Sequence, residues 1–261
     1  MAPVMDIVTI GILASLGAGL MTGVGAVPVL FGRGISQRWN DGFLGFAAGV
    51  MLSASYFSLI LPGIDAAESL YGSVVIAAVI AGAGIALGAL VVAALNELLP
   101  HEHFILGPEG SDPGALAKIW LFIIAITIHN LPEGLAVGVG FGGGDITNGM
   151  SLATGIGLQN APEGLAVAIA LRGQGYSKLG SFGIALATGL IEPVGGALGV
   201  IAVHASAVAL PWGLTFAAGA MLYIISHEII PETHRHGHQN MATAGLVLGL
   251  IVMMVLDVTL G

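Results

Sequence analysis

The chain has 261 residues, of which 56% are hydrophobic and only 8% are charged, and its formal net charge is −9. A soluble globular domain carries roughly 25% charged residues, so a mean hydropathy of +0.98 excludes a soluble enzyme or binding module. The negative net charge argues against a nucleic-acid partner. The chain has no cysteine, which excludes disulfides and thiolate metal sites.

The apolar runs have the length of membrane-spanning helices. Each is roughly 20 residues long, whereas strands of a membrane β-barrel alternate over roughly ten residues. We therefore predict an all-α integral membrane protein with one transmembrane domain over residues 1–261. The first run is long and lacks a basic segment before it, so we expect no cleavable signal peptide. The eight predicted spans are about 7–29, 42–61, 71–95, 119–140, 150–171, 179–204, 209–230 and 242–260.

Two prolines mark the predicted ends of spans. Proline inside a helix removes a backbone donor and clashes with the preceding turn. Pro62 is therefore expected to end the second span, which places Asp65 and Glu68 in a short loop, and Pro231 is expected to end the seventh.

The basic residues predict the orientation of the chain in the membrane. All six lie in alternate loops, and short loops rich in Lys and Arg stay on the cytoplasmic side. We therefore expect a multi-pass protein of the cytoplasmic (inner) membrane with both termini outside and the histidine-bearing loops inside. The six residues are Arg33, Arg38, Lys118, Arg172, Lys178 and Arg235.

An internal repeat relates the two halves of the chain. The segment LGFAAGVML at 44–52 resembles LTFAAGAML at 214–222, and the two copies fall in the second and seventh spans. Spans two and seven cross the membrane in opposite directions, which is the pattern of an inverted repeat. We predict a 3+2+3 arrangement, with spans four and five as the central pair.

A second repeat places polar side chains in that central pair. The unit Asn-x-Pro-Glu-Gly-Leu-Ala-Val begins at Asn130 and again at Asn160. His129 and Glu133 are four residues apart and so share one helix face. Gln159 and Glu163 repeat this spacing in span five, with an amide in place of the imidazole.

Prolines and a third acid extend this polar cluster. Pro132 and Pro162 each leave a carbonyl without its helical donor, and irregular backbone at membrane depth is found where it lines a cavity. Glu192 lies within span six and is also followed by a proline. The donors are all nitrogen or oxygen, which suits Zn²⁺, Cd²⁺, Fe²⁺ or Mn²⁺.

A purely structural interpretation of the cluster is the alternative. His129 could hydrogen-bond between helices, and Asn130 and Asn160 could serve helix packing. However, acids within membrane spans mark functional sites, and the glutamates here have no Lys or Arg at the same depth. They therefore require another cation or a proton.

The motifs together resemble those of the ZIP (Zrt-, Irt-like protein) family of metal transporters. The segments HNLPEG and QNAPEG, the Glu192-Pro193 pair and SHEIIPE at 226–232 carry the resemblance, and the QN-x-PEG form is similar to the GufA-like bacterial branch. The resemblance implies a transporter domain of eight helices, a zinc-type substrate moved into the cytoplasm, a homodimer, and neither enzymatic activity nor an organic cofactor.

The resemblance also implies two adjacent metal positions. The first would use His129, Glu133, Gln159 and Glu163. The second would use Asn130, Glu133, Asn160, Glu163 and Glu192. Some relatives have an Asp where this chain has Asn160, so we expect the second position to bind metal more weakly here.

Residues on either side of these positions match a transport route. Met51, Ser58 and Asp65 are seven apart on one stripe and match an entrance in relatives, although Met51 and Ser58 taken alone favour packing. Asp257, in span eight, is expected to make only a local hydrogen bond. The residues matched or assigned to inner release are His101, His103, His227, Glu228, His234, His236 and His238.

Three rival functions differ in mechanism. Metal efflux is the nearest, because the sequence does not set the direction of transport. An intramembrane metalloprotease would need a motif such as H-E-x-x-H, but His227-Glu228 is followed by Ile-Ile-Pro and lacks the second histidine. A proton channel would explain the buried acids but not the imidazole and amides beside them.

Overall fold

A computed structural model describes residues 6–32, 36–98, 101–103, 107–109, 118–173 and 175–260, and nearly all of them are helical. The expected all-α class is confirmed. A short antiparallel hairpin that we did not predict, β1 (His101–His103) and β2 (Gly107–Glu109), lies between α4 and α5. The helices are α1 (Ile7–Leu30), α2 (Gln37–Ala54), α3 (Leu61–Tyr71), α4 (Val74–Leu98), α5 (Lys118–Gly142), α6 (Ile146–Gly173), α7 (Lys178–Gly189), α8 (Glu192–Ala205), α9 (Ala209–Ile224), α10 (Ile230–His234) and α11 (Gln239–Leu260), with π-helical turns η1 (Ser55–Ile60) and η2 (Ile225–Ile229).

Six helical stretches in the described part of the chain are long and apolar enough to cross a membrane. They are Ile7–Leu30, Gln37–Tyr71, Val74–Leu98, Lys178–Ala205, Ala209–His234 and Gln239–Thr259. Helices α5 and α6, which carry the repeated Pro-Glu-Gly motif, have 25 and 28 residues but are not among these six.

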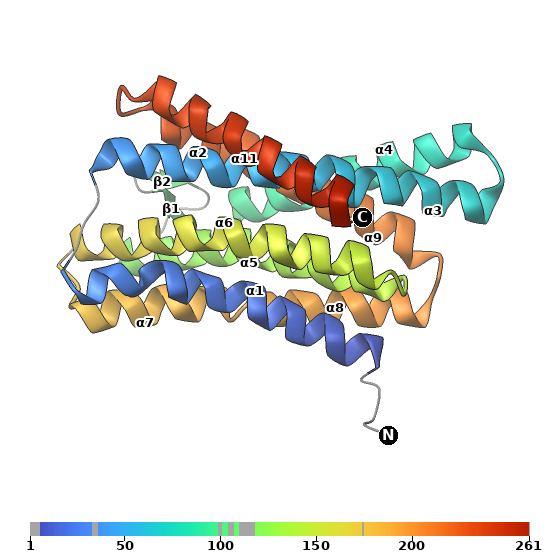
Figure 1. Cartoon of the computed structure of the whole chain (residues 1–261), viewed down its shortest axis with the longest axis horizontal. Coiled ribbons are helices and arrows are strands. Elements are labelled where there is room, and N and C mark those ends of the chain that lie inside the picture. The colour runs from blue at the N-terminus through green and yellow to red at the C-terminus, as the bar shows by residue number, and fades with distance from the viewer. Residues whose placement is uncertain are drawn as a thin grey trace.

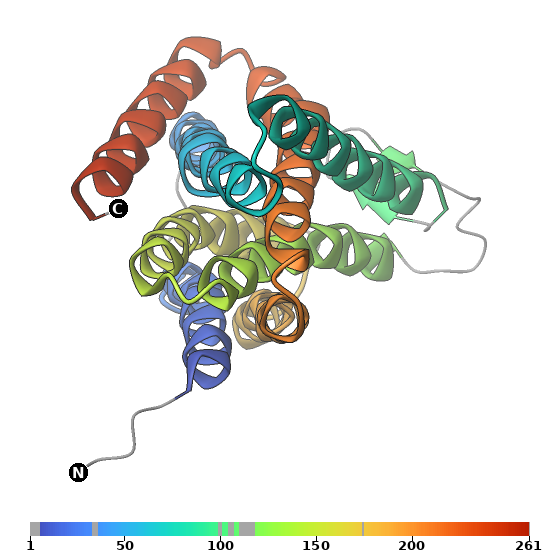
Figure 2. The same cartoon turned by 90° about the vertical axis from the view of Figure 1, so that its right-hand side faces the viewer.

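The helices form two layers that meet along α5 and α6. The upper layer in Figure 1 holds α2, α3, α4, α9 and α11, and the lower layer holds α1, α5, α6, α7 and α8. Within the layers α2 packs on α11, α4 on α9, α1 on α6 and α5 on α8. Figure 2, which looks along the bundle, shows α5 and α6 between the remaining lower-layer helices and the upper layer.

The prediction that prolines end the second and seventh spans is wrong. Helix α2 continues through η1 into α3, and α9 continues through η2 into α10. Pro62 and Pro231 each sit in the first turn of the next α-helical segment, where a missing N–H costs nothing. The π-helical turn before each proline absorbs the change of hydrogen-bonding pattern, so Asp65 and Glu68 belong to α3 rather than to a loop.

The two copies of the FAAGxML repeat occupy equivalent environments. Each copy ends shortly before a π-helical turn. Corresponding side chains of the two copies are completely buried, namely Ala47, Ala48 and Met51 in α2, and Ala217, Ala218 and Met221 in α9.

The glycine of the first Pro-Glu-Gly motif is the point at which α5 touches α8. Gly134 faces the backbone of Glu192, and a Cβ there would overlap the Glu192 carbonyl oxygen. On another side, the Ser15 hydroxyl donates to the Gly134 carbonyl at 3.2 Å. This close approach brings Glu192 beside the neighbouring Glu133.

We expect Gly134→Ala to lower the melting temperature of the purified protein, because a backbone cannot yield as a flexible side chain can, and overpacking typically costs about 1–3 kcal/mol. Gly183→Ala is the matched control, since a Cβ there meets nothing within 4 Å. Thermal unfolding in detergent measures both variants. Equal melting temperatures would contradict the close contact between α5 and α8.

Candidate metal site

The polar residues of the repeated motif lie in the interior, where α5, α6 and the first turn of α8 meet. Five of the seven candidate ligands are at most 2% exposed: Asn130, Glu133, Gln159, Asn160 and Glu192. Glu163 and His129, in α6 and α5, are half-buried. Helix α1 packs closely against α6, and α8 packs closely against α5, which buries this region.

Amides of α6 connect the carboxylates of the two neighbouring helices. The Gln159 side chain donates through Nε2 to Oε1 of Glu133 at 2.7 Å. The Asn160 side chain donates through Nδ2 to Oε1 of Glu192 at 2.6 Å and to the Ala18 carbonyl at 2.9 Å. These bonds gather the acids, so that Glu163 and Glu192 lie near enough to Glu133 to repel it when they are ionised.

All of the candidate ligands except His129 keep a buried atom without a protein partner. Native interiors leave few buried polar atoms unpaired, yet six of the ten unpaired ones in the described part of the chain belong to the candidate ligands. A divalent cation is the natural partner for carboxylate and amide oxygens gathered in this way. The six atoms are Asn130 Nδ2, Glu133 Oε2, Gln159 Oε1, Asn160 Oδ1, Glu163 Oε1 and Glu192 Oε2.

The described side chains are not closed around a single point. Within that part of the chain, no three His, Asp or Glu residues already surround a position that could hold a metal. The reason is that Glu133 and Glu192 are each turned onto an amide, and His129 is turned onto another acid.

His129 links the ligand cluster to the predicted release side. Its Nε2 contacts Oε2 of Glu228 in η2, and its ring also lies near enough to Glu163 to attract that carboxylate when the imidazole is protonated. Glu228 is 4% exposed and accepts a second hydrogen bond from Nδ2 of Asn96 at 3.2 Å. His129 therefore connects α5 in the lower layer to η2 in the upper layer. Asn96 was not among the predicted residues; its only sequence signal is an amide near the end of an apolar run.

The three predicted entrance residues do not share one environment. Met51 is fully buried in the apolar core and Asp65 is exposed on α3. Ser58 is buried and donates to Oδ1 of Asp257, which also accepts from Ser151 at 2.7 Å. The expectation of a local hydrogen bond for Asp257 is wrong, because both donors lie on other helices.

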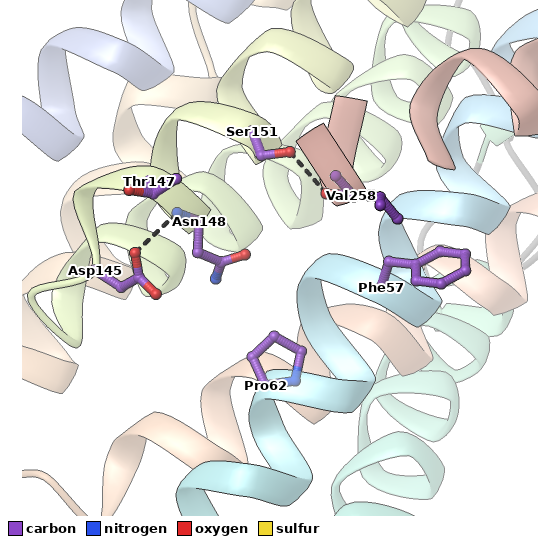
Figure 3. Close-up of a pocket in the computed structure, with 8 residues that line it drawn as sticks. Phe57, Pro62, Asp145, Thr147, Asn148, Ser151 and Val258 are labelled. Carbon is purple, nitrogen blue, oxygen red and sulfur yellow. Dashed lines mark hydrogen bonds between the residues drawn. The ribbon is translucent and has the colours of Figure 1, made fainter. Parts of the chain in front are cut away.

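A cavity of about 420 Å³ adjoins this second polar cluster. It lies between the α5–α6 turn, η1, the start of α3 and the end of α11, and Asp145 and Asp257 give it a negative lining. Figure 3 shows Asp145 and Asn148 across the cavity from Phe57. Ser151 and Asp257 therefore join the cavity wall to Ser58, whereas Met51 and Asp65 do not line it.

The histidines predicted on the release side separate into several environments. The ring of His227 stacks on Tyr223 with centroids 4.9 Å apart, and Nδ1 of His234 lies 2.9 Å from the Ile230 carbonyl of its own helix. The backbone of His101 and His103 forms β1, and their side chains lie outside the described part of the structure.

The last two histidines of the release set share a carboxylate that the sequence analysis did not single out. Nδ1 of His236 lies 3.2 Å from Oδ1 of Asp41, and Nδ1 of His238 lies 2.8 Å from Oδ2. Asp41 is only 1% exposed. It comes near the start of α2, almost 200 residues before its partners, so no local pattern could pair them.

Comparisons with known proteins identify the family of the chain. A family described as ZIP Zinc transporter matches residues 108–257. The chain is 45% identical to zinc transporter GufA of Myxococcus xanthus, over 96% of this chain and 99% of that protein. It is 45% identical to zinc transporter ZIPB of Bordetella bronchiseptica, over 92% and 78% respectively, and 36% identical to human zinc transporter ZIP11, over 92% and 94%. The chain therefore belongs to the ZIP zinc transporter family.

Proposed function

We propose that this protein carries Zn²⁺ across the inner membrane into the cytoplasm through the ligand cluster on α5, α6 and α8. The observation that carries the proposal is the set of buried, unpaired oxygens on Glu133, Glu163 and Glu192 and on the two amides between them. The family and the names of its relatives supply divalent metal transport as the activity. The nitrogen and oxygen donors also suit Cd²⁺, Fe²⁺ or Mn²⁺.

The roles proposed for the ligands are those that the family resemblance implies. In the proposed metal-bound state, Glu133 and Glu163 bridge two adjacent positions. His129 and Gln159 complete the first position, and Asn130, Asn160 and Glu192 complete the second. A divalent ion offsets the mutual repulsion of the acids, and the unpaired amide oxygens can face it once the carboxylates turn from the amide nitrogens.

Release would use the contact between His129 and Glu228. The Nε2 atom of His129 that contacts this acid in η2 cannot bind an ion at the same time. Exchange of His129 between metal and Glu228 therefore provides a step toward the inner side, where Asn96 already contacts Glu228. Entry would begin at the acidic cavity with Asp145 and Asp257, which contacts Ser58. Met51 and Asp65 are proposed entrance residues from the family resemblance alone.

The proposed topology adds α5 and α6 to the six candidate spans, giving eight crossings in a 3+2+3 inverted repeat within one transporter domain. The first turn of α1 and the last turn of α11 lie toward the same end of the bundle (Figure 1), as an even number of crossings requires. The alternate placement of basic residues puts both termini outside the cytoplasm. A homodimer is proposed from the family resemblance.

A single cysteine placed at Ser111, which lies outside the described residues, tests the orientation in a chain that has no cysteine of its own. We expect Ser111→Cys to resist a membrane-impermeant maleimide in intact cells, because the α4–α5 connection is cytoplasmic in this topology. Ser206→Cys, in the exposed connection after α8, should react readily. The reverse labelling pattern would overturn the orientation.

Removing ligands tests the midplane site directly. We expect His129→Ala and Glu163→Ala each to lower Zn²⁺ uptake into proteoliposomes by roughly tenfold or more, because little water replaces a lost ligand in a low-dielectric interior. Glu163→Gln should keep the fold while losing transport. Glu68→Gln, at an exposed acid on α3, is the matched control.

Near-normal uptake by all three ligand variants at normal protein levels would rule out the site.

Swapping the metal between the two sides of the vesicles tests the direction of transport. Transport that proceeds only outward in oriented vesicles would replace the uptake proposal with efflux.

The amide at position 160 is expected to keep the second metal position weak. A neutral oxygen offers no charge to offset a second dication about 4 Å away. Asn160→Asp should strengthen the second position, but in metal-free protein it should lower the melting temperature, because it loses two donor bonds and faces Glu192. Calorimetric titration and thermal unfolding measure the two effects. Two equally tight ions in the unmodified protein would contradict this interpretation.

A further inference from the structure

Four side chains converge at the inner end of α2, away from the midplane cluster. Asp41 is 1% exposed and is approached by the imidazoles of His236 and His238, which are 26% and 33% exposed. The Gln37 side chain places Nε2 2.8 Å from Asp41 Oδ1 and 3.2 Å from His236 Nδ1. A buried carboxylate thus lies under a thin cover of nitrogen donors at the protein surface.

A glycine turn presents both imidazoles to the same carboxylate. Gly237 stands between His236 and His238 and has a φ of 78°, a left-handed conformation that glycine adopts without strain. The turn directs the two rings onto different oxygens of Asp41, with Nδ1 of each ring facing an oxygen at 3.2 and 2.8 Å.

These separations are close to those between ligands of one metal ion. Two donors bound to a tetrahedral Zn²⁺ at roughly 2.0–2.1 Å are about 3.3 Å apart. The nitrogen–oxygen separations in the cluster, 2.8–3.2 Å, and the 3.2 Å between Nε2 of Gln37 and Nδ1 of His236 are shorter by only a few tenths of an ångström. The side chains do not yet surround one point, because the two imidazoles use separate oxygens, so a bound ion requires a small outward rotation of the rings.

The remaining chemistry of the cluster also suits a cation. Gln37 can present Oε1 instead of Nε2 after a rotation of its amide, since oxygen and nitrogen assignments of amides are interchangeable by a flip. Glu232 lies near enough to interact electrostatically with Asp41, His236 and Arg235. Two carboxylates would therefore attract a cation bound at this position, and one arginine would repel it.

We propose that Asp41, His236 and His238, with Gln37 or water as a fourth ligand, bind a divalent transition-metal ion such as Zn²⁺ at the inner surface. Such an ion would fasten the α10–α11 connection to α2. Because α10 continues directly from η2, which carries Glu228, an ion bound here restrains the segment that contacts His129. This second site would let metal at the inner face act on the release end of the route. The site does not depend on the midplane proposal.

Counting bound metal in the full-length, tag-free protein tests the proposal. Equilibrium dialysis against Zn²⁺ followed by elemental analysis is carried out on the unmodified chain, on Asp41→Asn and on the double variant His236→Gln, His238→Gln. All three are repeated in a His129→Ala, Glu163→Gln background, which removes proposed midplane ligands. We expect Asp41→Asn and the double histidine variant each to lose one equivalent of Zn²⁺ in both backgrounds, and Glu68→Gln to lose none.

Cobalt supplies an independent signature. Co²⁺ added to the midplane-deficient protein should give visible absorption bands typical of four-coordinate nitrogen and oxygen ligation, and these bands should be absent from Asp41→Asn. Unchanged zinc equivalents and unchanged cobalt spectra in the Asp41 and histidine variants would overturn the proposal, whatever the midplane variants do. If Asp41→Asn fails size-exclusion chromatography, His238→Gln alone decides, because its ring is at the surface.

Discussion

Three glutamates gathered in the interior of an apolar helix bundle, with no lysine or arginine side chain at their depth in the described part of the chain, set the main constraint on this protein. Burying even one uncompensated carboxylate costs several kcal/mol, and Glu133, Glu163 and Glu192 repel one another. The amides of Gln159 and Asn160 satisfy one oxygen on each of two acids and leave the other unpaired. This partial satisfaction holds the acids in place and leaves oxygens without a protein partner, which the proposed cation would bind.

Two further polar contacts connect the two layers of the bundle on either side of these glutamates. His129 bridges the layers to Glu228, and Ser151 bridges them to Asp257, which also holds Ser58. Ser58 and Glu228 occupy equivalent places in the internal repeat, each within a π-helical turn. The two bridges therefore resemble each other in position but differ in chemistry, with an imidazole–carboxylate contact at one and hydroxyl–carboxylate contacts at the other.

Local sequence signals predicted the parts of the protein that depend on short-range physics. Long apolar runs gave the all-α class, and the i, i+4 spacing placed polar side chains on shared helix faces. The prolines misled the prediction of span ends, because a π-helical turn before Pro62 and Pro231 lets the helix continue. The packing of the surrounding helices holds such a turn in place. The local rule that proline ends a helix does not take this packing into account.

The sequence by itself determined that the chain is a helical membrane protein, which motif carries the polar residues, and which metal chemistry those donors suit, because hydropathy, helical periodicity and ligand type are local properties. Only the tertiary structure decided which side chains meet. It paired Asp257 with serines of two other helices and Asp41 with His236 and His238. These contacts join positions about 100 to 200 residues apart, and packing between helices sets such distances, not the order of residues along the chain.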